Sequence, residues 1–214
     1  MCTRYYIEQD SPELAPLLHE VTTGLVARQF LHSQAKPILT SGEISPTSIA
    51  PTIATSRNGK KMVYPMQWGF QVRLPGRHAY HLPIIRNVFN ARSETAGETK
   101  LFAEEWASHR CIVPASWYYE WEHTIDASGK RVVGQRYAIQ PRTKETLWMC
   151  GLYKMVNSLP HFVILTREPT VELSGLHDRM PLILPEASVD EWIDPGSNPW
   201  LVAKNAMTDL ICWK

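Results

Sequence analysis

The sequence predicts an α+β fold built around a mostly antiparallel sheet. Most of the patterned segments alternate in polarity at every second residue, as strands do, and no regular alternation of strand and helix points to parallel βαβ units. The length of 214 residues suits one domain whose core is large enough to fold without a metal or a disulfide. We therefore expect residues 1–214 to form a single domain.

The first half of the chain is expected to contain two strands, one helix and two loops. Residues 2–8 resemble a short strand, and apolar residues at helical spacing predict a helix at 16–30 with a proline in its first turn. The segment 41–58 is rich in Ser, Thr and Pro, which predicts a loop. Residues 61–72 predict a strand, and 73–86, with its Pro-Gly pair and basic residues, predicts a surface loop.

The second half is expected to consist mainly of strands. After a short strand from Val88 to Arg92, the spacing of Thr95 and Glu98 predicts a capping box at the start of a helix. Alternating segments then predict strands at 110–114, 116–122, 135–140, 146–153 and 161–166. Residues 174–181 resemble a loop, and a short helix is expected at about 186–193.

Composition and charge limit the classes of function. The formal net charge of +1 excludes a basic nucleic-acid coat, so any DNA binding requires a local cluster of arginine and lysine. The four cysteines form no C-x-x-C pair and show no zinc spacing, so we expect neither a metal site nor a disulfide framework. No signal-peptide pattern or membrane-length apolar run is visible, and we expect a cytoplasmic protein.

Cys2 directly follows Met1, and a small second residue normally permits removal of the initiator methionine. Cys2 would then carry a free α-amine beside its thiol. Such a 1,2-aminothiol condenses with an aldehyde to an imine, and the thiolate closes a thiazolidine ring. An α-amine has a reference pKa of about 7.7–8.0, so part of it is unprotonated near neutrality. The alternative is an ordinary small residue, because a free cysteine usually behaves as a small hydrophobe.

Three further residues have side chains suited to a sugar or a phosphate. Arg4 shares a face with Cys2 if the segment is extended. Asn90 and Arg92 point the same way from a strand whose other face, including Ala91, is apolar. An amide can hydrogen-bond a sugar oxygen, and a guanidinium can hold a phosphate bidentately. The alternative is that these are solvated residues on the outer faces of amphipathic strands.

The aromatic run around Glu120 also alternates. Trp117, Tyr119 and Trp121 share one face, which we expect to anchor the core. Glu120 lies on the other face beside Tyr118, where neighbouring rings can raise its pKa and make it an acid or a base. The alternative is a glutamate that faces solvent.

His177 lies in the loop-like segment from Gly175 to Pro181. A histidine on a loop is well suited to proton transfer near neutral pH. Arg179 lies two residues further on and could bind an anion. Taken singly, both residues are also compatible with an ordinary surface loop.

Five segments occur in an order that is far more specific than any one of them. They are Cys2-Thr3-Arg4, Trp68-Gly69-Phe70, Asn90-Ala91-Arg92-Ser93-Glu94-Thr95, the run from Cys111 to Trp121, and His177-Asp178-Arg179-Met180-Pro181. In this order they resemble the SRAP family, the SOS-response-associated peptidases, known as abasic-site crosslinking proteins. The resemblance spans roughly residues 2–184.

The resemblance implies a single SRAP domain whose mixed sheet curls into a barrel-like core flanked by a few helices. It implies an enzyme that loses Met1 by processing or autoproteolysis and then joins Cys2 to an abasic site as a thiazolidine. By analogy, Asn90 hydrogen-bonds near the reacting amine and sugar. Glu120 assists opening of the sugar ring, and His177 shuttles protons. No cofactor or metal is implied.

The same resemblance assigns the contacts to DNA. Arg4, Arg92 and Arg179 would hold backbone phosphates, while Trp68 would stack on a base or support the groove. The implied partner is single-stranded DNA containing abasic sites, which the crosslink shields during the DNA damage response. We expect a monomer that associates with the nucleoid when it is bound to DNA.

The sequence departs from the family pattern at three places. Thr3 replaces the usual glycine. Glu43 stands where the family usually carries asparagine, and a carboxylate there is expected to repel a phosphate. The sequence ends at Trp213-Lys214, before a strand typical of the family, which is expected to weaken closure of the fold.

Two other functions fit part of the pattern. A cysteine peptidase or amidohydrolase acting on other proteins would pair the thiolate of Cys2 with the imidazole of His177. A non-catalytic module for single-stranded or damaged DNA would bind without any covalent bond. The adduct mass separates these alternatives, because only a crosslinker gains the mass of abasic DNA.

Overall fold

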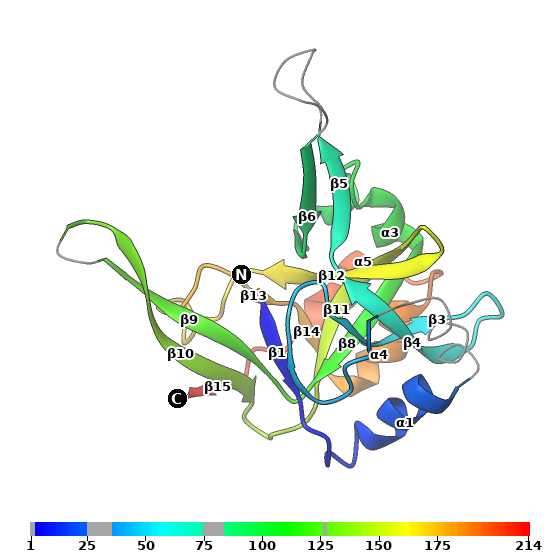
Figure 1. Cartoon of the computed structure of the whole chain (residues 1–214), viewed down its shortest axis with the longest axis horizontal. Helices are drawn as coiled ribbons and strands as arrows, with labels where there is room; N and C mark the ends of the chain where they lie inside the picture. Colours follow the sequence, from blue (N-terminus) through cyan, green and yellow to red (C-terminus); the bar gives the residue numbers. More distant parts are fainter. Residues whose placement is uncertain (1–2, 25–35, 75–83, 126–127) are drawn as a thin grey trace.

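Five strands close into a barrel at the centre of the computed structural model, which describes residues 3–24, 36–74, 84–125 and 128–214 (Figure 1). Each strand pairs with two neighbours, in the order β12, β4, β3, β8, β11 and back to β12. The strands are β3 (Ile49–Thr55), β4 (Lys61–Trp68), β8 (Arg110–Ala115), β11 (Leu147–Val156) and β12 (Leu159–Arg167). Only the β12–β4 pair of this ring is parallel, so the sheet is mixed and mostly antiparallel. The predicted fold class is confirmed.

Three short strands extend the barrel wall. They are β7 (Asn90–Arg92), β13 (Met180–Pro181) and β14 (Ile183–Leu184). Strand β7 runs parallel to β12 at residues 164–166, and β13 pairs antiparallel with it at residues 166–167. Segments that are far apart in the sequence therefore meet at the carboxyl end of β12.

A second sheet packs against the barrel and contains the first described strand of the chain. Its strands, in spatial order, are β15 (Leu210–Trp213), β10 (Arg131–Pro141), β9 (Trp117–Ile125), β1 (Arg4–Ile7) and β2 (Gly42–Ile44). All of these pairs are antiparallel. We did not expect a strand at 210–213, yet β15 pairs with β10 and extends this sheet at one edge.

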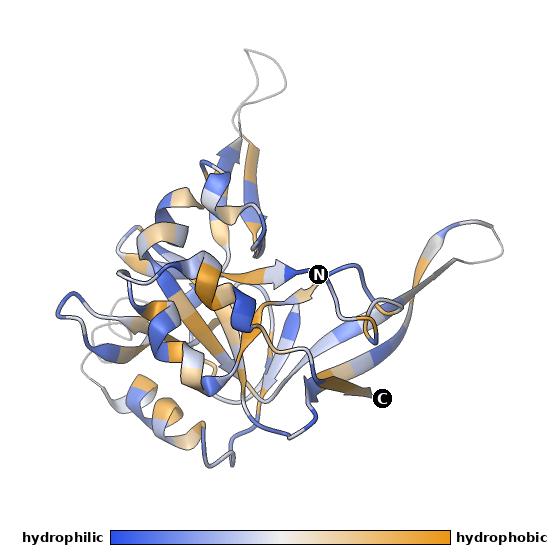
Figure 2. Cartoon of the chain, turned by 180° about the vertical axis from the view of Figure 1, so that it is seen from behind, coloured by the Kyte–Doolittle hydropathy of each residue, from blue (hydrophilic) through white to orange (hydrophobic). Residues whose placement is uncertain are grey.

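The barrel wall buries side chains on both of its faces. Along β8, Cys111 and Val113 belong to one apolar cluster, and Ile112 belongs to the other. The first cluster joins the barrel to the second sheet through Tyr5 and Tyr118. Figure 2 shows the hydrophobic residues concentrated in these strands and in the elements beside them. Because both faces are buried, these strands are nearly continuous hydrophobic runs.

Short helices complete the second apolar cluster. They are α3 (Ala103–Ser108), α4 (Val189–Ile193) and α5 (Pro199–Val202), with 3₁₀ turns η1 (Ala96–Glu98), η2 (Glu186–Ser188) and η3 (Ala203–Asn205). Helix α1 (Ala15–Thr23) begins with a proline in its first turn, as expected, and buries Leu18 and Val21. The remainder of the helix expected at 16–30 lies mostly outside the described residues. Within the described part of the chain, no helix is both long and apolar enough to span a membrane.

Arg110 binds the helical segments to the barrel. Its guanidinium is buried and donates hydrogen bonds to the carbonyl oxygens of Trp106, Ala107 and Trp192, at 2.6 to 2.9 Å. It also donates to the carbonyl of Asp194 and to Oγ of a nearby serine. Burial lowers the pKa of this guanidinium, which the Asp194 carboxylate partly opposes. These bonds satisfy the buried charge, which would otherwise be strongly unfavourable.

The prediction of a loop at 41–58 is wrong, because this segment forms β2 and β3. Strand β3 lies in the middle of the barrel wall, and its residues from Ile49 to Ala54 are buried. Pro51 lies opposite Pro65 in the β3–β4 ladder. The content of Ser, Thr and Pro misled the prediction, since Ile and Thr side chains pack well on a pleated surface.

The strand expected at 61–72 is interrupted at Gly69. This residue has φ of +119°, and a Cβ there would lie 2.7 Å from the ring of Phe89. The chain continues as β5 (Phe70–Leu74), which pairs with β6 (Ile84–Val88) in a two-stranded ribbon that projects from the barrel (Figure 1). The surface loop expected at 73–86 is therefore wrong at both ends, and its residues 75–83 lie outside the described residues.

The capping box expected at Thr95 and Glu98 is also wrong. Thr95 makes no side-chain cap, and the segment forms the 3₁₀ turn η1 before α3 begins at Ala103. The amide of Glu98 donates instead to the carbonyl of Thr95, at 3.0 Å. Spacing alone did not reveal that the chain turns once more before the helix.

Candidate functional site

Asn90 and Arg92 lie on β7, at the carboxyl end of β12. Ala91 between them is buried, Asn90 is partly buried and Arg92 is exposed, as the alternation predicted. The hydroxyl of Thr166 donates to the carbonyl of Ala91 at 3.3 Å, and the amide of Ser93 donates to the carbonyl of Thr166 at 2.9 Å. These bonds fix β7 against the barrel, so that Asn90 is held by rigid structure.

Glu120 lies on the inward face of β9, which reverses the expected orientation of this strand. Tyr118 is fully buried and Glu120 is 4% exposed. Trp117, Tyr119 and Trp121, which we expected to anchor the core, are only partly buried on the opposite face. The second sheet presents the Tyr118–Glu120 face to the barrel, so the carboxyl is buried and the larger rings face outward.

Burial raises the pKa of Glu120 to about 7, and the negative charge of Asp178 adds to the rise. A carboxyl with this pKa can donate and accept a proton near neutral pH. The influence of Asp178 shows that the loop before β13 lies near β9. Two of the residues singled out from sequence, Glu120 and His177, are thereby brought into one region.

His177 is mostly buried, with 10% of its side chain exposed. Its Nδ1 lies 3.0 Å from the amide nitrogen of Arg179 and 2.6 Å from Oδ1 of Asp178. The first contact requires Nδ1 to accept, and the second requires it to carry a proton. The two contacts therefore require the proton at different places on the imidazole ring, because the neutral ring can carry it on either nitrogen.

Arg179 ties the loop that carries His177 to the barrel. Its guanidinium donates to Oε2 of Glu94 and to the carbonyl of Thr166, both at 2.6 Å. Only 11% of the Arg179 side chain is exposed. Partial burial opposes ionisation of Glu94, but the hydrogen bonds that its carboxylate accepts from Arg179 and from backbone amides, together with the charge of Arg179, lower its pKa. These contacts indicate a positioning role for Arg179, and its expected phosphate contact stays a prediction.

Cys2 lies outside the described residues, and the nearest described candidate is Arg4 on β1. Arg4 pairs with Tyr119 in an antiparallel register. Followed back toward its amino terminus, β1 therefore runs alongside β9 in the direction of Glu120. Nε of Arg4 donates to Oε1 of Glu43 at 3.0 Å, which the sequence did not lead us to expect.

Trp68 has no exposed surface, so the expectation that it stacks on a base is wrong. Its ring packs against Tyr5 and lies parallel to Phe162, with centroids 5.4 and 6.0 Å away. Its Nε1 donates to the carbonyl of Phe89 at 2.9 Å. Of the two roles expected for Trp68, stacking on a base or supporting the groove, only the supporting role agrees with this buried position.

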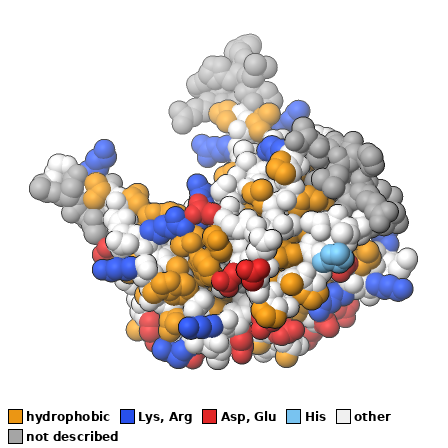
Figure 3. Space-filling view, turned by 60° about the horizontal axis from the view of Figure 1, so that its bottom comes forward, with side chains coloured by type: hydrophobic (Ala, Val, Ile, Leu, Met, Phe, Trp, Pro, Cys, Tyr) orange, Lys and Arg blue, Asp and Glu red, His pale blue; other side chains and the backbone are white. Residues whose placement is uncertain are grey.

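Charged side chains of both signs lie close to one another on the surface of the protein. On the face shown in Figure 3, basic, acidic and hydrophobic side chains are interspersed, and no broad basic surface is visible. Arg92 is exposed and makes no ion pair with any described residue. Arg136 on β10 pairs with Glu43 at 2.7 Å, and the sequence gave no signal for this pairing, because it depends on the order of the strands. Among the described residues, no group of His, Cys, Asp and Glu side chains is arranged to hold a metal ion.

The chain matches the model of a known family, SOS response associated peptidase (SRAP), over residues 1–210. It is 30% identical over 224 residues to abasic site processing protein YMR114C of Saccharomyces cerevisiae, a match that covers 94% of this chain and 57% of the yeast protein. It is 34% identical over 113 residues to abasic site processing protein YobE of Bacillus subtilis, covering 50% of this chain and 49% of that protein. The chain therefore spans about half the length of these curated relatives.

A solved structure shares the fold. The crystal structure of a protein from Bacteroides thetaiotaomicron superposes with a TM-score of 0.68 and 18% sequence identity, covering 99% of this chain and 91% of that one. At this level of identity the likeness concerns the fold alone.

Proposed function

This chain belongs to the SOS response associated peptidase family, and from that premise we propose that it processes abasic sites in single-stranded DNA by forming a covalent bond through Cys2. The names of its relatives in yeast and Bacillus subtilis refer to abasic site processing, which supports the proposed substrate. The crosslink would shield the abasic site in damaged DNA, and a cytoplasmic monomer made of one SRAP domain would suffice for it.

The observation that carries the proposal is the buried carboxyl of Glu120. Its raised pKa of about 7 suits it to proton transfer at neutral pH. Arg4 pairs with Tyr119, so β1 lies directly beside the strand that carries this carboxyl. Opening of a closed sugar requires an acid–base group of this kind.

The proposed reaction has three steps. The abasic sugar is a closed hemiacetal, and Glu120 assists transfer of the proton of the anomeric hydroxyl to the ring oxygen, so that the bond between C1 and the ring oxygen breaks and the aldehyde forms. Once Met1 has been removed, by processing or by the protein itself, the free amine of Cys2 attacks the aldehyde, and the resulting imine forms with loss of one water. The thiolate of Cys2 then adds to the imine carbon, and the nitrogen takes up a proton to give a thiazolidine.

The remaining candidates have supporting roles in this scheme. Asn90, fixed on β7, is suited to hydrogen-bond a sugar oxygen. His177, whose Nδ1 has one neighbour that donates to it and one that can accept from it, would carry protons during ring opening and imine formation. The exposed Arg92 and the half-exposed Arg4 would hold phosphates, because abasic DNA offers no base to read at the lesion.

A denaturing gel with an abasic single-stranded oligonucleotide tests the proposal. The unsubstituted protein should give a shifted band, and Cys2→Ala should give none. Cys212→Ala is the matched control, because Cys212 is an exposed thiol and should not be needed. Glu120→Gln should slow the appearance of the band, by roughly 100-fold for loss of a general acid or base.

Two results would overturn the proposal. A band that persists in Cys2→Ala would place the covalent bond elsewhere. Turnover of peptide substrates without any DNA adduct would favour a cysteine peptidase acting on proteins. Single-stranded DNA should also react faster than duplex, and equal rates would contradict recognition of the single strand.

A further inference from the structure

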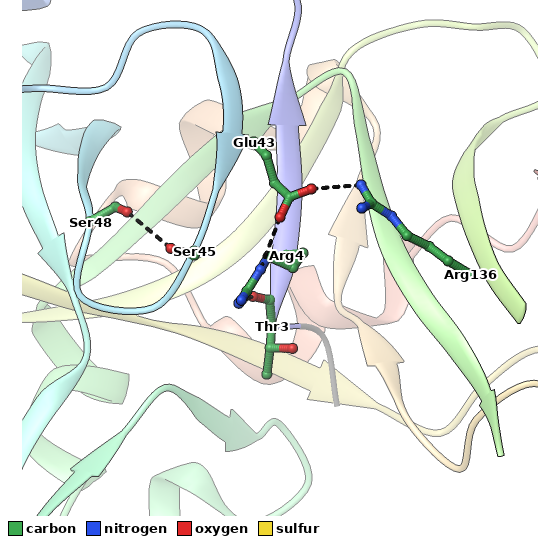
Figure 4. Close-up of polar contacts among 6 residues, drawn as sticks. All are labelled: Thr3, Arg4, Glu43, Ser45, Ser48 and Arg136. Carbon is green, nitrogen blue, oxygen red and sulfur yellow. Dashed lines mark hydrogen bonds and ion pairs between the residues drawn. The ribbon is translucent and has the colours of Figure 1, made fainter. Parts of the chain in front are cut away.

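Glu43 accepts ion pairs from two arginines that come from different strands. Nε of Arg4, on β1, lies 3.0 Å from Oε1, and a terminal nitrogen of Arg136, on β10, lies 2.7 Å from Oε2 (Figure 4). The two guanidinium groups approach the carboxylate from different directions, and each binds its own oxygen. Together they form a site for an anion with at least two oxygens, and the carboxylate of Glu43 occupies it.

The strand register brings these three side chains to the outward face of the second sheet. Glu43 lies beside Tyr6 on β1, Arg4 beside Tyr119 on β9, and Arg136 beside Trp121 on the same strand. The side chains of Arg4, Glu43 and Arg136 are 35, 38 and 39% exposed. An anion from solution can therefore reach the arginines.

The guanidinium of Arg136 is held in place by more than its ion pair. Its central carbon lies 3.4 Å from the centre of the Tyr119 ring and 5.6 Å from that of Trp121. Stacking on aromatic rings reduces the conformational freedom that a long side chain loses on binding. Arg136 is consequently ready to bind an anion if Glu43 moves aside.

We propose that Arg4 and Arg136 form a binding site for a backbone phosphate of the DNA strand, and that Glu43 is an internal carboxylate which this phosphate displaces. The proposal rests on the proposed function. A phosphodiester and a carboxylate each carry one negative charge and two oxygens suited to guanidinium groups, so one can replace the other. Arg4 lies two residues after Cys2 in the sequence, the residue proposed to form the covalent bond.

Glu43 then restricts which strands bind well. With the carboxylate in place, the two arginines present one net positive charge, and a phosphate must compete with an anion already bound. Non-specific binding of nucleic acid depends largely on unopposed positive charge. Glu43 should therefore weaken the binding of intact DNA, and the covalent step at the lesion should still retain abasic DNA.

Binding of an intact, fluorescently labelled single-stranded oligonucleotide, measured by anisotropy at several salt concentrations, tests this role. Glu43→Gln should bind roughly tenfold more tightly, because one nearby negative charge is removed. Its logarithmic salt dependence should be steeper by about 0.7, the effect of one additional phosphate contact with a single strand. Arg136→Gln should bind several-fold more weakly, and in the double variant the gain from Glu43→Gln should be largely lost.

Glu191→Gln is the matched control, because it changes the net charge equally at an exposed position of α4. An affinity and salt dependence for Glu43→Gln equal to those of Glu191→Gln would overturn the proposal, as would an unchanged affinity in Arg136→Gln. Arg136→Gln alone decides the matter if Glu43→Gln proves unstable. Crosslinking of abasic DNA is measured in parallel. Its absence from every protein, with the affinity pattern intact, would reject the proposed covalent function and leave the phosphate site standing.

Discussion

Replacing Glu120 with glutamine should stabilise the fold at alkaline pH. Burial, with a contribution from Asp178, raises the pKa of this carboxyl from 4.5 to about 7. A group whose pKa is higher in the folded chain than in the unfolded chain contributes its full stability when the pH is below its pKa in the unfolded chain. This contribution is lost as the pH rises through its pKa in the folded chain. At about 1.36 kcal/mol per unit of pKa, the ionised carboxylate lowers the free energy of unfolding by about 3 kcal/mol in alkaline solution.

Urea unfolding of both proteins at about pH 5 and about pH 9 measures this effect. Glutamine has the same shape and no charge, so the advantage of Glu120→Gln in free energy of unfolding should grow by about 2–3 kcal/mol between the two conditions. Glu191→Gln, which removes an exposed carboxylate, provides the comparison. If the difference in free energy of unfolding between Glu120→Gln and the unsubstituted protein does not change with pH, the raised pKa of Glu120 is refuted and, with it, the acid–base role.

Four other substitutions test the contacts that position the site. Arg110→Met should lower the free energy of unfolding, measured by urea denaturation, by about 3–5 kcal/mol, because it leaves several buried carbonyl groups without a hydrogen-bond donor. A loss below about 1 kcal/mol would contradict the importance of these hydrogen bonds. Gly69→Ala should lower stability by about 1–3 kcal/mol, because its φ is positive and its Cβ meets an aromatic ring, and an unchanged Tm would contradict this. Arg179→Gln and Glu94→Gln should each slow crosslinking by misplacing the loop of His177. In the double variant the two effects on the crosslinking rate should not add. Strict additivity would show that the ion pair between Arg179 and Glu94 is not the cause of the slower crosslinking.

Much of the fold could be predicted from the sequence because strand alternation is a local signal. The segments that form β8 to β12 each show it, and the structure has a strand at every one. Strand β3 was missed because its Thr and Pro, and the Ser residues on either side of it, are typical of loops, while its burial on both faces depends on the strands beside it. The orientation of β9 was predicted wrongly for the same reason. Alternation shows which side chains share a face, but only packing decides which face is inside.

The candidate site was predictable where residue type and order were informative. Asn90 and Arg92 alternate on β7 as expected, and Glu120 and His177 come from segments that the fold brings together. The pairing of Arg136 with Glu43 could not be foreseen, because it requires knowing that β2 and β10 contribute to the same sheet face. Burial of Trp68 was equally invisible, since a tryptophan before a glycine is compatible with a core or with a surface.

The chemical state of the amino terminus in the crosslinked product decides whether Cys2 forms the covalent bond. Peptide mapping by mass spectrometry, after reaction with an abasic oligonucleotide and digestion of both components, measures it directly. We expect the modified peptide to begin at Cys2 and to have gained the mass of the sugar fragment less one water, with its thiol blocked. A modified peptide that retains Met1, or a sugar attached to an internal lysine, would contradict it.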